Sequence, residues 1–410
     1  MLIAPELDYP SDPFIATKPF FESFWMAGFE GADHVNGLGQ PLDMTRSNDH
    51  VGRVDQDYAA AAGMGLRTVR ETIGWRLSEP ERGRFDLRRA LHFMKAARKY
   101  NVQIIWTLMH YGTPDDIRIT APDFAERFAQ FAEHVARTLA PEFDRPPIYN
   151  PINEISFLSW AVSATALIHP YQAATDGSTL GSGYEVKRQL VKGCVLGMKA
   201  MRAVDPRARF MHIEPVVHVV APDDQPELAT VAEEVRAYQW QSWDLLCGRL
   251  EPELGGTPAL LDLIGVNHYH SSQWEVTTER RLDWHLADPR WLPLSDLLSE
   301  VWRRYGRPLV IAETSHVGSG RGTWIRDIAL SAQRSLAEGV PLHGICLYPA
   351  VDRQDWSDAN HWHQSGLWDV DASQGMRRQL NFEYAKALLR SQRLLAPQVV
   401  MMAPCAPLPR

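Results

Sequence analysis

Short apolar runs recur along the chain and alternate with segments of helical periodicity. Eight runs have the length and composition of buried strands, namely Phe24–Phe29, Arg67–Glu71, Val102–Met109, Ile148–Asn153, Arg209–Ile213, Leu263–Asn267, Leu309–Ala312 and Gly344–Leu347. Apolar residues spaced three and four apart predict helices between them, including Leu87–Tyr100, Asp123–Leu139, Tyr184–Val204, Leu294–Tyr305 and Trp324–Glu338. Such alternation is typical of α/β proteins with parallel strands. It predicts a closed (β/α)8 TIM barrel.

An open, doubly wound sheet is the competing fold. Its nucleotide-binding form carries a glycine fingerprint after the first strand, whereas this chain continues beyond Phe29 with Glu-Gly-Ala-Asp-His. We therefore expect a single barrel domain over residues 1–396 and an aperiodic, proline-rich tail over residues 397–410. Three βα loops are longer than usual and follow strand ends, where barrel active sites form; they are 155–183, 215–260 and 270–293.

Composition narrows the classes of partner. The formal net charge is −8 and no cluster of Lys and Arg stands out, which argues against nucleic acid. No run of about 18 apolar residues and no basic, apolar leader is present, so we expect no membrane partner and a cytoplasmic location. The four cysteines are scattered, which indicates reduced thiols; they are Cys194, Cys247, Cys346 and Cys405. The oligomeric state cannot be read from the sequence.

Two carboxylates stand where a buried strand ends. Glu154 follows the apolar run Ile148–Ile152, and Glu313 follows Leu309–Ala312. Each acid taken alone would pass for a solvated strand-end residue, but two at matching positions face the same mouth of a barrel. Glycoside hydrolysis needs such a pair, one acid protonated to donate to the leaving oxygen and one ionised.

The surrounding motifs resemble a known family. Asn-Glu closing the fourth strand and Glu closing the seventh are the pattern of the clan A retaining glycosidases. Glycoside hydrolase family 1 is similar in four further stretches, namely Val69–Trp75, Thr107–Pro114, Gly265–Tyr269 and Tyr348–Trp356. The chain thus resembles a divergent member of the β-glucosidase and β-galactosidase family. The resemblance covers roughly residues 24 to 371.

The resemblance implies roles for individual residues. Glu313 would be the nucleophile and Glu154 the acid/base of a double displacement at a β-glycoside. Arg70 would keep Glu313 ionised, and Tyr269 would orient it by a hydrogen bond. The residues expected to bind the carbohydrate are His34, His110, Asn153, Tyr348, Asp355 and Trp356. The family's chemistry needs no metal and no cofactor.

Departures from the family pattern limit what can be carried over. Tyr348 stands where the family usually has Trp, Asp355 where it has Glu, and His34 where it has Gln. Ile155 follows the acid/base in place of Pro, and Thr314 follows the nucleophile in place of Asn. A shorter acid and a smaller aromatic ring alter the sugar contacts. The resemblance therefore does not identify the sugar.

Two alternatives remain open at this point. A metal-dependent hydrolase on the same barrel is suggested by two His-x-His pairs, His268/His270 and His361/His363. The metal-dependent barrels place such a pair after the first strand, where this chain has none. A sugar-binding protein without turnover is the other alternative, suggested by the altered residues after the eighth strand.

Overall fold

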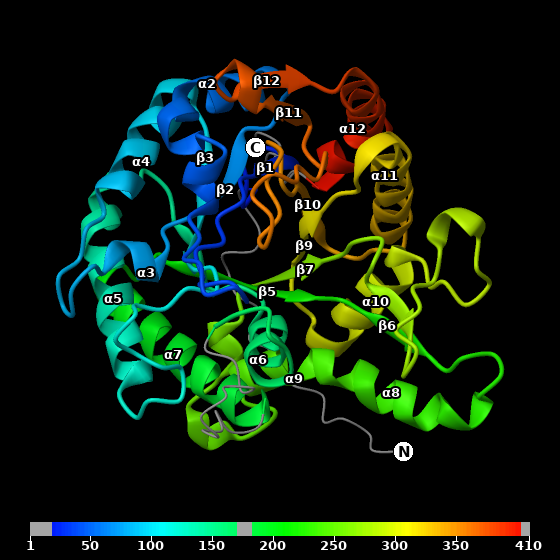
Figure 1. The fold of residues 1–410 in the computed structure, drawn as a ribbon, viewed down its shortest axis with the longest axis horizontal. Helices are drawn as coiled ribbons and strands as arrows, with labels where there is room; N and C mark the ends of the chain where they lie inside the picture. The colour runs from blue at the N-terminus through cyan, green and yellow to red at the C-terminus, as the bar shows by residue number, and fades with distance from the viewer. Residues whose placement is uncertain (1–18, 170–182, 403–410) are drawn as a thin grey trace, which may run out of the picture.

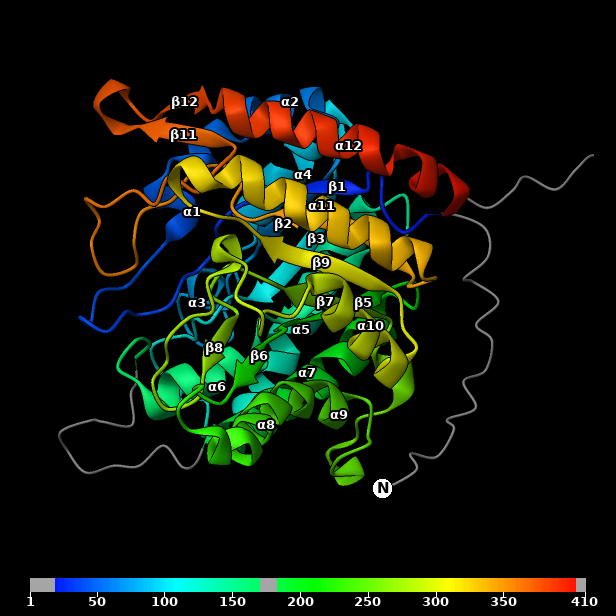
Figure 2. The ribbon, with the colours of Figure 1, turned by 90° about the vertical axis from the view of Figure 1, so that its right-hand side faces the viewer.

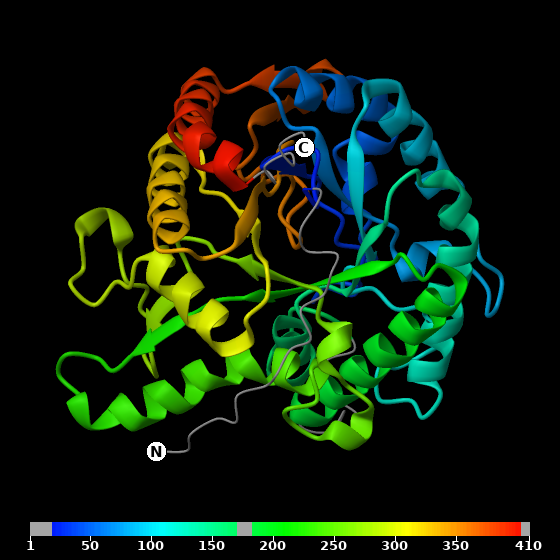
Figure 3. The same cartoon turned by 180° about the vertical axis from the view of Figure 1, so that it is seen from behind.

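The computed structural model describes residues 19–169 and 183–402. Parallel strands close into a single barrel in the order β1-β10-β9-β7-β5-β4-β3-β2. Their bounds are β1 Trp25–Gly28, β2 Thr68–Thr72, β3 Gln103–Met109, β4 Ile148–Ile152, β5 Arg209–Pro215, β7 Leu263–Asn267, β9 Leu309–Thr314 and β10 Leu342–Leu347. Figure 1 shows the strands at the centre of an outer ring of helices, and Figure 3 shows the same ring from behind. The predicted TIM barrel is confirmed.

Helices follow the strands along the chain, and the larger ones form the outer ring of the barrel. They are α1 Met44–Ser47, α2 His50–Gly63, α3 Trp75–Ser78, α4 Arg88–Tyr100, α5 Phe124–Leu139, α6 Ile155–Ala164, α7 Gly183–Val204, α8 Ala229–Ala237, α9 Gln241–Leu246, α10 Leu294–Tyr305, α11 Arg321–Ala337 and α12 Phe382–Met402. The five helices predicted from periodicity are all present. That periodicity reports burial of one face of each helix against the strands.

The long βα loops contain structure of their own. The segment 215–260 holds β6 (His218–Val220) together with α8 and α9, and 270–293 holds β8 (Gln273–Glu275), which pairs with β6. The segment 155–183 begins with α6, and its residues 170–182 lie outside the described part. After β10, the hairpin of β11 (Trp368–Asp371) and β12 (Arg377–Leu380) leads into α12.

Two apolar cores flank the strands. Inside the barrel a small core is formed by residues that alternate along the strands, among them Met26, Ile105, Ile148, Met211, Ile213, Leu263, Val310, Ala312 and Cys346. Outside, a larger core fills the space between strands and helices. Toward the carboxyl ends of the strands the inward positions become polar, as at Arg70 and Glu313, which are both buried. The barrel therefore supports a polar site at that end.

The carboxyl-terminal segment differs from the expectation of an aperiodic tail beginning at residue 397. Helix α12 contains Pro397 and continues to Met402. Proline removes one backbone donor and crowds the preceding turn, but the helical assignment continues past it. In Figure 2, α12 lies beside α11. Residues 403–410 are outside the described part of the chain.

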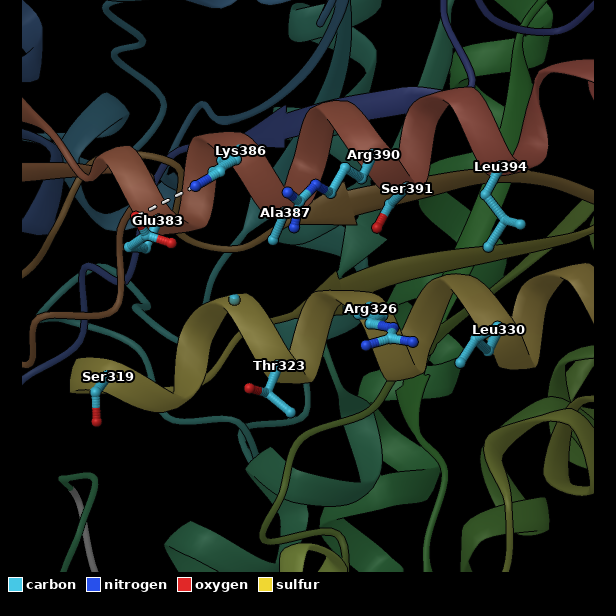
Figure 4. A pocket seen from close by; sticks show the side chains of 11 residues that line it. Ser319, Thr323, Arg326, Leu330, Glu383, Lys386, Ala387, Arg390, Ser391 and Leu394 are labelled. Carbon is cyan, nitrogen blue, oxygen red and sulfur yellow. Dashed lines mark ion pairs between the residues drawn. The ribbon is translucent and has the colours of Figure 1, made fainter.

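A groove of about 770 Å³ runs between α11 and α12 (Figure 4). Its walls carry Arg326 from one helix and Lys386 and Arg390 from the other, with Glu383 as a counter-charge. The groove is lined by none of the predicted site residues.

Two further expectations from composition concern thiols and membranes. Cys194, Cys247 and Cys346 are buried and free, whereas Cys405 lies outside the described residues. Within residues 19–169 and 183–402, no helix has the length and apolar character needed to cross a bilayer.

Candidate active site

The strand ends bring the predicted catalytic and supporting residues to one place. Arg70 lies in β2, Glu154 follows β4, Tyr269 follows β7, and Glu313 lies in β9. β9 extends to Thr314, so Glu313 belongs to the strand instead of following it as expected. Because all eight strands are parallel, their carboxyl ends meet at one mouth of the barrel.

Glu313 is buried, with 4% of its surface exposed, and both carboxyl oxygens have partners. Arg70 Nη1 donates to Oε1, and the hydroxyl of Tyr269 donates to Oε2 at 2.8 Å. Burial and the nearby carboxylates raise the pKa of Tyr269 well above its usual value, so this hydroxyl keeps its proton. Glu313 therefore has a positive partner and a fixed orientation.

Arg70 links the carboxylate of Glu313 to Asn153 and Thr107. It is 2% exposed; its Nη2 donates to Asn153 Oδ1 (2.6 Å) and its Nε to Thr107 Oγ1 (3.2 Å). Its guanidinium carbon lies 5.0 Å from the centre of the Tyr348 ring. Burial alone would lower the pKa of Arg70, but the charge of Glu313, with smaller contributions from other neighbours, outweighs burial and raises the pKa above its usual value. Arg70 is a permanent cation at the centre of the site.

Glu154 is held in a different electrostatic state. It is 8% exposed; Asn267 Nδ2 donates to its Oε1 at 2.8 Å, and the Tyr111 hydroxyl bonds its Oε2. Burial raises the pKa of Glu154 to about 8, and the neighbouring Glu313 adds to this effect, although the two hydrogen bonds oppose it. The environment of Glu154 therefore favours its protonated form.

A continuous chain of hydrogen bonds joins the two acids. From Glu313 it runs through Arg70 to Asn153. Asn153 Nδ2 then donates to the Tyr111 hydroxyl (3.2 Å), which in turn contacts Glu154. The chain contains two carboxyl groups and a single cation. Such a charge balance favours one protonated and one ionised acid.

His110 is a neutral ring within the same network. Arg70 can only donate hydrogen bonds, so the atom of Asn153 that faces it is the acceptor Oδ1. The amide nitrogen Nδ2 of Asn153 therefore faces His110 and donates to its Nε2 (3.2 Å). The ring proton is thereby assigned to Nδ1, which lies 3.1 Å from Thr72 Oγ1. Burial, with a contribution from Arg70, lowers the pKa of His110 well below its usual value.

His34 and Trp356 present unused polar atoms next to these residues. The two rings are 4.6 Å apart between centres, and Tyr111 lies 5.8 Å from His34. Among the described residues, neither ring nitrogen of His34 has a hydrogen-bond partner, nor does Trp356 Nε1. Buried polar atoms normally have partners, so orphans gathered in one place point to a ligand.

The ring of Tyr348 packs against β1 because Gly28 leaves room for it. A Cβ on Gly28 would lie 2.2 Å from the Tyr348 ring, so only glycine permits this packing. The Tyr348 hydroxyl accepts from the backbone N–H of Gly31 (3.3 Å) and lies 3.5 Å from His110 Nδ1. The tyrosine is thus fixed between β1 and the cation of Arg70.

Asp355 is not brought together with the other predicted residues. Its carboxylate accepts from the backbone N–H groups of Ser357 (2.8 Å) and Asp358 (3.2 Å) and bonds His363 Nε2 (3.1 Å). Its side chain is 36% exposed. In the described part of the chain, its hydrogen bonds all stay within its own loop. Its role in binding a sugar remains a prediction.

Three residues of the site were not singled out from the sequence: Tyr111, Asn267 and Glu30. Glu30 is 3% exposed and its carboxyl accepts from the N–H of Ala32 (3.0 Å) and pairs with Arg353 (3.3 Å). Burial raises its pKa, which Arg353 opposes. All three lie at or just after a strand's carboxyl end. That position was the signal available in the sequence.

The histidines that suggested a metal enzyme make contacts with aromatic rings and with Asp355. His268 is stacked on Trp324, with ring centres 5.7 Å apart, and His270 is 4.3 Å from His316. His363 pairs with Asp355. Across residues 19–169 and 183–402, no group of three or more His, Cys, Asp or Glu side chains has a geometry suited to a metal ion.

Comparisons with known proteins connect this architecture to solved structures. No family model and no curated sequence matches the chain. The AHE enzyme from Alicyclobacillus herbarius superposes with a TM-score of 0.69 at 19% identity, over 90% of this chain and 97% of that one. The β-glycosidase BGL167 gives a TM-score of 0.68 at 18% identity, over 95% and 99%. The family 1 β-glucosidase from Thermotoga maritima gives 0.69 at 14%, over 93% and 99%. The chain has the fold of the family 1 β-glucosidases, as its strand-end motifs predicted.

Proposed function

We propose that this protein is a retaining β-glycoside hydrolase with Glu313 as nucleophile and Glu154 as acid/base. The observation that carries the proposal is the pair of buried carboxyl groups with one cation between them. Arg70 contacts Glu313, whereas the pKa of Glu154 is raised to about 8. An ionised nucleophile and a protonated donor are the two states that the first step of the reaction requires.

In the first step a carboxylate oxygen of Glu313 attacks the anomeric carbon. The bond from that carbon to the leaving oxygen breaks, and the proton of Glu154 passes to the leaving oxygen. Tyr269 and Arg70 hold the attacking group in place. The products of this step are a glycosyl ester on Glu313, an ionised Glu154 and the free aglycone.

In the second step Glu154 acts as base. It takes a proton from water while the water oxygen attacks the anomeric carbon and displaces the carboxylate of Glu313. Both acids then return to their starting states, and the sugar leaves with its original anomeric configuration. Asn267 and Tyr111 contact Glu154 in the free protein and orient its carboxyl.

The carbohydrate would be bound by polar atoms that are unused in the free protein. His34 and Trp356 offer such atoms, and Asn153 and His110 offer polar atoms that a sugar hydroxyl could share. The aromatic rings of Trp356 and Tyr348 suit the apolar faces of a sugar. Solved structures with the same fold include β-glucosidases. A β-linked carbohydrate is therefore the proposed substrate class.

Hydrolysis of aryl β-glycosides tests the proposal directly. We expect turnover that persists with a chelator present, and NMR of the first sugar product should show the β-anomer. Chelator-sensitive turnover would support the metal-dependent alternative, and sugar binding without turnover the non-catalytic one.

A second test addresses the nucleophile itself. The variant Glu313→Gly should lose hydrolysis and recover it with azide or formate, which can occupy the vacated position. A normal rate in this variant would remove Glu313 from the mechanism. A crystal structure should place the two carboxyl groups about 5 to 5.5 Å apart, since separations of about 6.5 to 9.5 Å belong to inverting enzymes.

A further inference from the structure

Helix α6 begins at the residue that follows Glu154. Ile155 is its first residue, and Glu154 is its N-cap, in the left-handed backbone region (φ 43°, ψ 63°). The first N–H groups of a helix have no partners within it, and they form its positive end. A carboxyl at the N-cap is normally drawn to those N–H groups, which favour its ionised form. A general acid must instead keep its proton, so its carboxyl has to stay away from these N–H groups.

The side chain of Glu154 does not cap its own helix. Its carboxyl instead turns toward Asn267 and Tyr111 in the barrel mouth. The N–H of Ser156 is taken by a different acid, Glu214, whose Oε2 accepts it at 2.9 Å. The backbone N–H of Ile155 lies close enough to help lower the pKa of Glu214. Glu214 thus occupies the start of α6 in place of Glu154.

Glu214 lies on the outer face of β5 and is 1% exposed. Its neighbour Ile213 points into the barrel core, so alternation along the strand directs Glu214 toward the helices. Burial raises the pKa of Glu214, while Lys187 and the N–H groups of α6 lower it. Lys187 is itself 5% exposed, with its Nζ 2.8 Å from Gln241 Oε1. A buried cation therefore accompanies this carboxyl.

Charged and titratable groups face Glu154 from several elements. Glu313 of β9 and Glu214 of β5 raise its pKa through their charge. The hydroxyl of Tyr111 contacts it from the end of β3, and Tyr269 lies within electrostatic range from the end of β7. The charge of Glu313 is opposed by Arg70, and that of Glu214 is opposed by Lys187. Of these groups, only Glu214 binds the start of α6.

We propose that Glu214 is a positioning residue for the acid/base: it binds the first N–H groups of α6, so that Glu154 neither caps this helix nor faces its uncompensated positive end. The carboxyl of Glu154 is thereby left free to project into the site in its protonated form. This inference rests on the proposed function for its consequence in catalysis. The structural part of the inference, that Glu214 keeps Glu154 away from the start of α6, does not depend on the proposed function.

The test compares Glu214→Gln with Glu214→Asp. Glutamine keeps an acceptor for Ser156 but removes the charge, whereas aspartate keeps the charge on a shorter side chain. With a 4-nitrophenyl β-glycoside, the basic limb of the kcat/KM profile should move to lower pH by about half a unit in Glu214→Gln. In Glu214→Asp the limb should stay near the wild-type position. A purely structural role would lower activity at all pH values without moving the limb.

Two further readouts separate this inference from the proposed function. A 2,4-dinitrophenyl leaving group needs little protonation, so its kcat/KM should fall less in Glu214→Gln than that of the 4-nitrophenyl substrate. NMR of protein labelled at the glutamate carboxyl carbons follows the titration of Glu154 without turnover, with E154Q identifying its signal. This titration should also move to lower pH in Glu214→Gln.

Each outcome has a defined meaning. An unchanged basic limb and an unchanged Glu154 titration in Glu214→Gln would overturn the inference while leaving the hydrolase proposal intact. Equal shifts in the glutamine and aspartate variants would also overturn it, because the charge would then be irrelevant. A wild-type protein without hydrolysis, but with the Glu154 titration moved by Glu214→Gln, would refute the proposed function and support the positioning role.

Discussion

Strand β2 separates two buried polar clusters that differ in their charge balance. On its inner side Arg70 joins Glu313 and Asn153, from which the network continues to Glu154. On its outer side lies a cluster of five residues between the strand, α2 and β12, namely His50, Asp57, Tyr58, Glu71 and Arg378. We call the latter the outer cluster.

Every carboxylate of the outer cluster has a cation. His50 contacts Asp57 through Nδ1 (2.8 Å) and Glu71 through Nε2 (2.9 Å), and Arg378 holds Asp57 at 2.8 Å. Burial lowers the pKa of His50, but Glu71 and Asp57 outweigh it and raise the pKa to about 9. Two anions thus face two cations. Such a balance suits a structural role.

The inner network has one cation for two carboxyl groups. Arg70 pairs with Glu313, and Glu154 takes up a proton because no second cation faces it within the described residues. Both clusters are almost fully buried, so burial alone does not distinguish structure from chemistry. An excess of acids over bases does distinguish the catalytic network from the structural cluster, because the excess acid holds a transferable proton.

Removing the inner cation should have the largest effect. In Arg70→Gln, Glu313 remains buried without a positive partner, and kcat/KM on aryl β-glycosides should fall on the order of 1,000-fold. Steady-state kinetics measures this, with circular dichroism as a control for folding. A fall of less than about tenfold would show that the cation does not support the nucleophile.

Removing an outer carboxylate should affect stability and spare catalysis. Asp57→Asn leaves Arg378 and His50 with one anion between them, which should lower the free energy of unfolding by about 3 to 5 kcal/mol. Urea denaturation measures the loss. The kcat/KM of the folded variant should stay within about threefold of wild type, and a larger loss would mean that the two clusters are coupled.

Alkaline pH should weaken the outer cluster next. The folded pKa of His50 is about 9, above the unfolded value of about 6.5, so its contribution is complete below pH 6.5 and is lost as pH rises through 9. We expect a decline in unfolding free energy on the order of 3 kcal/mol across this window. His50→Gln should lack this component, and an equal decline in that variant would assign it to another group.

The inner network predicts that activity declines at high pH. Because catalysis needs protonated Glu154, kcat/KM should fall above about pH 8, by about tenfold per unit of pH. The measurement is a pH profile with a 4-nitrophenyl substrate on protein that remains folded throughout. A profile that stays flat to pH 10 would contradict the assigned proton donor.

The smallest effect is expected at the loop after β10. Asp355 bonds its own loop and His363, so Asp355→Asn should change kcat/KM by less than about threefold. Trp356→Ala serves as the comparison. Because Trp356 contacts His34, its removal should lower kcat/KM by more than Asp355→Asn does. A large loss in Asp355→Asn would show that the loop rearranges to bring this acid to the sugar.

The barrel itself could be predicted because its strands are buried on both faces. Such strands are short, continuous apolar runs, and all eight were found with small errors at their ends. The placement of Glu154 and Glu313 at strand ends followed from the same runs. The network between them could be anticipated only in part, through the resemblance of the segments around Arg70 and Tyr269 to known motifs.

The remaining features depend on contacts that no local pattern records. Glu214 lies on β5, and only the packing of α6 against that strand brings it to Ser156. The hydrogen bonds of Asp355 to N–H groups in its own loop were likewise not anticipated, and its role toward a sugar stays a prediction. Pro397 suggested an end to regular structure, but α12 continues past it. In each case tertiary packing or a local hydrogen bond decides the outcome.

The left-handed backbone of Glu154 places catalysis and stability in opposition. Glutamate adopts this region less readily than glycine or asparagine, and burial penalises an ionised carboxyl there as well. Asparagine at position 154 would relieve both, so a screen for thermal resistance alone should enrich inactive variants at this position. Directed evolution of the protein would therefore need to select on turnover at every round.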